Sequence, residues 1–242
     1  MGPEDEPHYS VVIPVFNEEA SLEPLAQGIR AALEPLGRSF EVLFVDDGSK
    51  DGTIDTLRRL HSEDGRIHYL RLETNCGQST ALWAGLKRAR GRVIITMDGD
   101  LQNDPSDIPV LLEKLDQWDV ATGWRKERKD PWSKRISTRI ANGVRNLWTM
   151  EDVRDSACGF KAFHRECLEA LVPFDGMHRF LPTLFRMQGL RVCEVPIPHH
   201  PRLHGASKYN IRNRLLRGLW DLCGVRWLKK RRLSYRVTEE GK

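Results

Sequence analysis

Short apolar runs alternate with amphipathic stretches along the first half of the chain. The apolar runs predict buried strands at Tyr9–Val15, Glu41–Val45, Ile67–Leu72 and Val93–Met97. A helical period of apolar positions predicts helices between them, at Ser21–Leu36, Thr53–His61 and Ser79–Ala89. We expect Ser21 to cap the first of these helices and Gly91 to follow the last. This alternation predicts an α/β fold with a mostly parallel central sheet that is flanked by helices on both faces.

The pattern is less regular after Thr122. The charged residues 124–135 predict a loop, and residues 136–150 have a helical pattern. Further on, the sequence predicts a strand at Cys158–Phe163, a helix at Arg179–Gln188, a strand at Val192–Val195 and a long helix at Asn210–Leu228. We expect one domain over residues 8–209 and an amphipathic, basic extension over residues 210–242.

Composition narrows the class of protein. The chain has 242 residues, 40% of them hydrophobic and 30% charged, which is typical of a globular protein with one substantial domain. A formal net charge of +4 is modest and predicts no particular partner, and we expect no nucleic-acid partner. No run approaches the ~20 apolar residues of a membrane span, and the acidic N-terminus does not resemble a signal peptide. Five cysteines without a CxxC pair favour reduced thiols, so we expect a cytoplasmic location.

An acidic motif directly follows the strand predicted at Val93–Met97. Asp98 and Asp100 are separated by one glycine, so both carboxylates can converge on one divalent cation. Oxygen ligands of this kind suit Mg²⁺ or Mn²⁺, although an ordinary acidic turn is the alternative. The histidines at 199, 200 and 204 lack the spacing of a known metal cluster, and we do not expect a metal there.

Two more polar motifs follow the first and second predicted strands. Asn17-Glu18 and Asp46-Asp47 are expected at the same edge of a parallel sheet as Asp98, where their carboxylates could bind base and ribose groups. Taken singly, each could instead be a turn or a helix cap. The sequence contains neither GxGxxG nor GxxxxGK[ST], so no glycine-rich loop is available to bind phosphate. A metal would have to take that role.

Several segments together resemble a known family. The order PVFNE, VDDGSKDGT, NCGQSTALWAGLKRARG and MDGDLQNDP is similar to the family-2 glycosyltransferases of GT-A fold, and within them to the dolichyl- and polyprenyl-phosphate mannosyl- or glucosyltransferases. GWR, KRISTRIAN, DSACGFKAF and PRLHGASKY extend the likeness to about residue 210. The resemblance implies an inverting enzyme that uses Mn²⁺ or Mg²⁺ to move a sugar from a GDP- or UDP-sugar to a polyprenyl phosphate.

The resemblance also implies residue roles on the donor side. The nucleoside pocket would comprise Pro14, Phe16, Glu18 and Asp46 or Asp47. Asp98 would meet the ribose or the metal, and Asp100 and Gln102 would face the metal. Arg202, Ser207 and Lys208 would close over the diphosphate, with Arg202 counted among the catalytic residues.

On the acceptor side, Arg125, either Lys134 or Arg135, and Thr138 would hold the lipid phosphate. A phosphate monoester is already ionised at neutral pH, so it needs cations more than a general base. Asp155 matches an acidic family position near the reaction centre. One alternative function is transfer to a hydroxyl of a glycan or protein, for which Asp155 would be the base. Another is a nucleotide-sugar-binding protein without catalytic activity.

The expected C-terminal helix has apolar residues over about half of its surface, including Leu216, Trp220, Leu222 and Trp227, and ends in the basic run Lys229–Arg232. Such a helix suits the surface of an anionic membrane. Packing on the domain, or in the interface of a homo-oligomer, is the alternative. We therefore expect a peripheral protein on the cytoplasmic face of a membrane.

Overall fold

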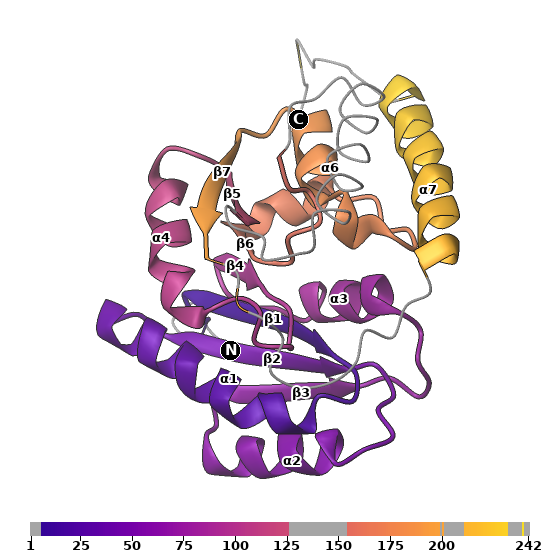
Figure 1. The fold of residues 1–242 in the computed structure, drawn as a ribbon. Helices are drawn as coiled ribbons and strands as arrows, with labels where there is room; N and C mark the ends of the chain where they lie inside the picture. The colour runs from indigo at the N-terminus through magenta and orange to yellow at the C-terminus, as the bar shows by residue number, and fades with distance from the viewer. Residues whose placement is uncertain (1–5, 126–153, 199, 201–210, 232–238, 240–242) are drawn as a thin grey trace.

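The computed structural model describes residues 6–125, 154–198, 200, 211–231 and 239. Within these residues one sheet has the strand order β3-β2-β1-β4-β6-β5-β7 (Figure 1). Strands β1 to β4 are mutually parallel, whereas β6 runs antiparallel to both β4 and β5, and β5 and β7 are parallel. The predicted, mostly parallel α/β sheet is therefore confirmed. The strands are β1 Tyr9–Val15, β2 Phe40–Asp46, β3 Ile67–Arg71, β4 Val93–Thr96, β5 Val120–Arg125, β6 Lys161–His164 and β7 Val192–Ile197.

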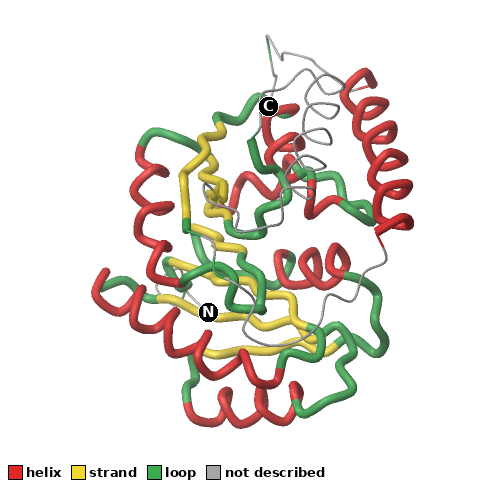
Figure 2. Tube along the Cα trace, viewed as in Figure 1, coloured by secondary structure: helices red, strands yellow, loops and turns green. Residues whose placement is uncertain are grey.

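Helices cover both faces of the sheet (Figure 2). The described helices are α1 Glu19–Leu33, α2 Thr53–Glu63, α3 Gln78–Leu86, α4 Ile108–Leu112, α6 Leu181–Met187 and α7 Ile211–Arg231. Alternate residues of β1 enter different cores, because successive strand side chains point to opposite faces. Val11 and Ile13 pack with α1, α2 and α4, whereas Val12 packs with α3, α6 and α7.

Several boundaries differ from the sequence prediction. The first helix begins at Glu19 and contains Ser21, which is buried and donates its hydroxyl to Glu18, so Ser21 is not the N-cap. Helix α3 ends at Leu86, well before Gly91. Gly91 instead passes close to β1, where an added Cβ would lie 2.5 Å from the Ser10 nitrogen. Arg125 belongs to β5 and not to a loop. The helix expected at 136–150 lies outside the described residues.

The half of the last helix that the sequence predicts to be apolar is divided between the core and the surface. Leu222 and Val225 of α7 are buried in the core that also contains α3 and α6. Trp220, expected on the same stripe as Leu222, is 81% exposed, and Trp227 is 61% exposed. One edge of the apolar half therefore packs on the domain, and the other edge is exposed. Among the described residues no helix is long and apolar enough to span a bilayer.

Candidate active site

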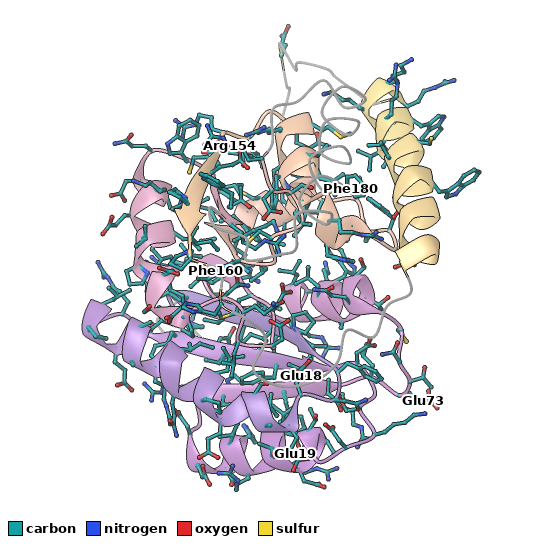
Figure 3. The ribbon with its side chains drawn as sticks, in the orientation of Figure 1. Glu18, Glu19, Glu73, Arg154, Phe160 and Phe180 are labelled. Carbon is teal, nitrogen blue, oxygen red and sulfur yellow. The ribbon has the colours of Figure 1, made fainter. Side chains whose placement is uncertain are left out.

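The three polar motifs meet at the carboxyl edge of β1, β2 and β4, as the sequence predicts. In the β1–β2 register Val15 pairs with Asp46, so both strands end at the same level. The Asp47 nitrogen donates to the Val15 carbonyl at 2.9 Å, and the Asn17 nitrogen donates to Ser49 Oγ at 2.8 Å. These bonds join the turn after β1 to the turn after β2. Figure 3 shows Glu18 of this edge at the start of α1.

The carboxylates of the turn that follows β2 accept hydrogen bonds from backbone N–H groups. Both oxygens of Asp47 accept backbone hydrogen bonds, from Cys76 at 2.7 Å and Gly77 at 2.9 Å. Asp46 Oδ1 accepts from the Ser49 nitrogen at 2.9 Å, while its buried Oδ2 lies 3.6 Å from Arg71 Nε and accepts no hydrogen bond from the described residues. Of the two, Asp46 retains an acceptor atom, and Asp47 anchors the loop that leads to α3.

The acidic motif after β4 lies in a different environment. Asp98 is partly buried, and its Oδ1 accepts from Gln78 Nε2 of α3 at 2.9 Å. Burial and the neighbouring Asp100 raise the pKa of Asp98 above its usual value. Asp100 is buried and accepts from the Gln102 nitrogen at 3.2 Å. Two carboxylates whose repulsion raises a pKa form a donor set that a divalent cation would stabilise, so the residues fit a metal.

Backbone strain is confined to this edge of the sheet. Among the described residues other than glycine, a positive φ occurs only at Asn17 (53°) and Leu101 (59°). Asparagine tolerates this conformation, and its side chain here accepts from the Lys50 nitrogen at 2.8 Å. Leucine rarely adopts it, and strain of this kind concentrates at functional sites. The strain at Leu101 sets the turn between Asp100 and Gln102.

Lys161 and Gly159 were not identified from the sequence as site residues. An added Cβ on Gly159 would lie 2.4 Å from both carboxylate oxygens of Asp98, so only glycine allows this close approach. Lys161 is fully buried in β6 and donates from Nζ to the Cys158 carbonyl. Burial lowers the pKa of Lys161, while the charges of Asp98 and Asp155 oppose that shift. The sequence feature that could have identified Lys161 is a lysine within an otherwise apolar strand, because a buried charge requires a partner.

Arg125 and Asp155 form an ion pair beside this motif. Arg125 Nε and NH2 donate to the two oxygens of Asp155, at 2.6 and 2.9 Å. Both side chains are largely buried. Burial lowers the pKa of Arg125, but the hydrogen bond and charge of Asp155 outweigh that effect and raise it. Glu194 fixes the same segment by accepting the backbone N–H groups of Arg154 and Asp155. The structure thus pairs the residue expected to hold an acceptor phosphate with the residue considered as a general base.

The segment after β7 reaches the acidic motif. The His200 nitrogen donates to the Gln102 carbonyl at 3.1 Å, and His200 Nε2 lies 3.9 Å from Asp104. Within the described part of the chain, no three His, Cys, Asp or Glu side chains form a metal-binding group. A cation at Asp98 and Asp100 would therefore need further oxygen ligands, such as Gln102, diphosphate or water. The other predicted site residues lie outside the described residues: Lys134, Arg135, Thr138, Arg202, Ser207 and Lys208.

Sequence comparison gives the family. A protein-family model described as glycosyl transferase family 2 matches residues 10–172. Dodecaprenyl-phosphate galacturonate synthase of Rhizobium johnstonii is 38% identical over 89% of this chain and 65% of that protein. Undecaprenyl-phosphate 4-deoxy-4-formamido-L-arabinose transferase of Pseudomonas aeruginosa is 39% identical over 88% of this chain and 63% of that protein. This chain spans slightly less than two thirds of the length of these relatives.

Solved structures support the fold. A mannosyltransferase from Pyrobaculum calidifontis, in complex with GDP-Man and Mn²⁺, has a TM-score of 0.66 at 20% identity. The alignment covers 92% of this chain and 64% of the mannosyltransferase chain. Glucosyl-3-phosphoglycerate synthase from Mycobacterium tuberculosis, in complex with Mn²⁺ and UDP-glucose, has a TM-score of 0.66 at 21% identity and covers 90% and 79%. These likenesses confirm the expected fold.

Proposed function

Because the chain belongs to glycosyl transferase family 2, we propose that it transfers a sugar from a nucleotide-diphosphate donor to the phosphate of a polyprenyl lipid. The names of the relatives at 38% and 39% identity, a dodecaprenyl-phosphate synthase and an undecaprenyl-phosphate transferase, support this acceptor class. The observation that carries the proposal is the bidentate pairing of Arg125 with Asp155. A carboxylate held in this way is a poor general base, because removing its negative charge would leave a buried guanidinium unpaired.

An acceptor phosphate has no need of that base. It is ionised at neutral pH, so it can attack the anomeric carbon directly once cations hold it beside the donor. Asp155 binds Nε and one terminal nitrogen of Arg125, so the other edge of this planar guanidinium would bind phosphate oxygens in pairs. Lys134 or Arg135, with Thr138, would add to this site. Attack from the side opposite the leaving diphosphate inverts the configuration at the anomeric carbon.

The donor would lie across the edge formed by β1, β2 and β4. Pro14, Phe16 and Glu18 would line the nucleoside pocket, where the spare acceptor atom of Asp46 makes it a better base ligand than Asp47. Asp98, Asp100 and Gln102 would hold Mn²⁺ or Mg²⁺, and Arg202, Ser207 and Lys208 would cover the diphosphate. When bound, such a cation stabilises the negative charge that develops on the leaving diphosphate. Asp155 would orient Arg125 and would not remove a proton.

The chemistry of the acceptor places the enzyme at a membrane. Each CH₂ of a polyprenyl chain costs about 0.8 kcal/mol to expose to water, so the lipid stays in the bilayer and the protein must approach it. We propose that the protein acts at the cytoplasmic face, where nucleotide sugars would be available. A homo-oligomer is compatible with this role.

The test varies the acceptor head group. The purified chain should convert short-chain polyprenyl phosphate, but not the matching polyprenol, when a panel of GDP- and UDP-sugars is supplied with Mn²⁺ and the lipid product is identified by mass spectrometry. Comparable transfer to polyprenol or to a glycan hydroxyl would show that the acceptor class is wrong. Nucleotide-sugar binding without transfer to any acceptor would indicate a binding protein.

A further inference from the structure

We propose that the outer face of α7, formed by Trp220, Cys223, Trp227, Lys230 and Arg231, docks the protein on an anionic membrane surface. This inference rests on the proposed function, because the lipid acceptor gives the protein a reason to meet a bilayer. It adds the surface that makes the contact and the chemistry of that contact.

The helix geometry separates this outer face from the buried one. At about 100° per residue, positions 220, 227 and 231 fall within about 20° of a common line along the helix. Leu222 and Val225 lie on the opposite side and are 5% and 1% exposed in the core. The outer residues are therefore not an extension of the core.

The outer face is also the most exposed apolar feature of the described residues. Trp220 and Trp227 are 81% and 61% exposed, while the other exposed large apolar side chains are between 38% and 44% exposed. Those others lie elsewhere, Val110 on α4 and Trp118 and Val172 in loops. Tryptophan is enriched where a protein meets the interface of a bilayer, because its ring is apolar and its N–H is polar. Two such rings, two helical turns apart, suit a flat lipid surface.

Charge favours an anionic lipid as the partner. Lys230 and Arg231, in the last turn of α7, are exposed, and neither forms an ion pair with a described residue. Basic side chains next to interfacial tryptophans are attracted to phosphatidylglycerol or other anionic headgroups. A second copy of this chain with its α7 parallel would place the same positive charges against each other, which disfavours that occupant.

The helix is fixed to the domain and linked to the active site. Asp221 on its flank pairs with Arg179 at 3.0 Å. The turn that contains Arg179 begins at Gly176, whose backbone nitrogen donates to Ser79 Oγ of α3 at 2.9 Å. The neighbouring residue of α3, Gln78, donates to Asp98. A membrane bound to α7 would therefore orient the whole domain, and with it the acidic motif, relative to the lipid phosphate.

The experiment compares matched surface variants of the full chain in co-sedimentation with vesicles of phosphatidylcholine, with and without phosphatidylglycerol. Trp220→Ser/Trp227→Ser should weaken binding about tenfold or more for each ring, whereas Trp118→Ser should not change it. Lys230→Gln/Arg231→Gln should weaken binding to anionic vesicles about fivefold per charge at low salt, with little effect on neutral vesicles. Arg58→Gln/Arg59→Gln on α2 removes the same charge elsewhere and serves as the control.

Two further measurements keep the inference separate from the proposed function. Transfer to a water-soluble, short-chain acceptor should be the same in all these variants, because none of the changed residues is in the active site. If vesicle binding depends on α7 but the protein transfers no sugar, the proposed function is wrong and the docking surface stands. Vesicle binding that is absent, or insensitive to both α7 double variants, overturns the docking surface, as does a stable dimer in light scattering that Trp220→Ser/Trp227→Ser dissociates.

Discussion

The acidic turns after β2 and β4 lie on either side of β1 and have similar compositions, yet the structure uses them differently. In the first, Asp46 and Asp47 accept backbone N–H groups of Ser49, Cys76 and Gly77. In the second, Asp98 accepts from a side chain, Gln78, and Asp98 Oδ2 accepts no hydrogen bond from the described residues. Asp47 is therefore an anchor through both of its oxygens, whereas Asp98, like Asp46, keeps one carboxylate oxygen for the ligand that we propose it binds.

The largest loss of activity should follow when the second turn loses one carboxylate. Asp100→Ala is expected to lower transfer by about three orders of magnitude or more, because a bound cation contributes several kcal/mol of charge stabilisation. EDTA should have the same effect on the wild type, and Mn²⁺ should reverse it. The measurement is kcat with saturating donor, with circular dichroism to check the fold. Full activity in excess EDTA would contradict the assignment of the second turn as a metal site.

A smaller loss of activity should follow when Asp98 is displaced but kept. In Gly159→Ala the new methyl group would start 2.4 Å from the carboxylate oxygens, so Asp98 must move. A displacement of this size can cost about a hundredfold in rate. Gly65→Ala is the control, because nothing lies within 4 Å of its added Cβ. Steady-state kinetics of both variants check this, and equal activities would show that the position of Asp98 is not critical.

Lys161 offers a way to test the support beneath Asp98. Lys161→Met keeps the volume and removes the ammonium that binds the Cys158 carbonyl, and we expect kcat to fall about tenfold. Thr96→Val removes a second bond to the same segment, from Thr96 Oγ1 to the Gly159 carbonyl at 2.7 Å. If both residues act by holding this segment, their effects on kcat in the double variant should be less than additive. Fully additive effects would assign them independent roles.

The smallest effect on catalysis should come from the first turn. Asp47→Asn should lower the free energy of unfolding by about 1–3 kcal/mol, because one of two backbone N–H groups loses its acceptor. The rise in Tm that Mn²⁺ produces should be unchanged, whereas Asp98→Asn should abolish it. Burial raises the pKa of Asp47, so the wild type loses stability as pH rises through that pKa, and the asparagine variant does not. The stability difference should therefore be larger at acidic than at neutral pH in thermal melts.

The sequence was sufficient for the first half of the fold. Continuous apolar runs at β1, β2 and β4 are typical of strands that are buried on both faces, and parallel strands bring the turns that follow them to one edge. Asp46, Asp47, Asp98 and Asp100 could therefore be placed together without a structure. Which of them serve the backbone could not be predicted, because the loop that Asp47 holds begins about 30 residues later in the chain.

The second half depends on contacts that local patterns do not encode. Strand β6 enters between β4 and β5 in the opposite direction, and its short sequence gives no sign of that pairing. The ion pair of Arg125 with Asp155 joins residues 30 positions apart, so each could be proposed alone but not as a pair. In α7 the periodicity correctly predicts a helix, but tertiary packing decides that Leu222 is buried and Trp220 is not.

The antiparallel insertion of β6 has a consequence for the order of events during synthesis. Strands β1 to β4 contact one another and are complete once residue 96 has left the ribosome, whereas Gly159 and Lys161, which support Asp98, are made much later. At ~5–20 residues per second, this interval lasts about 3–13 s. During that time a nascent chain can form the edge of β1, β2 and β4 while the surroundings of Asp98 are still incomplete. If the proposed function is right, a chain built in this order would not turn over a donor before β6 has been synthesised.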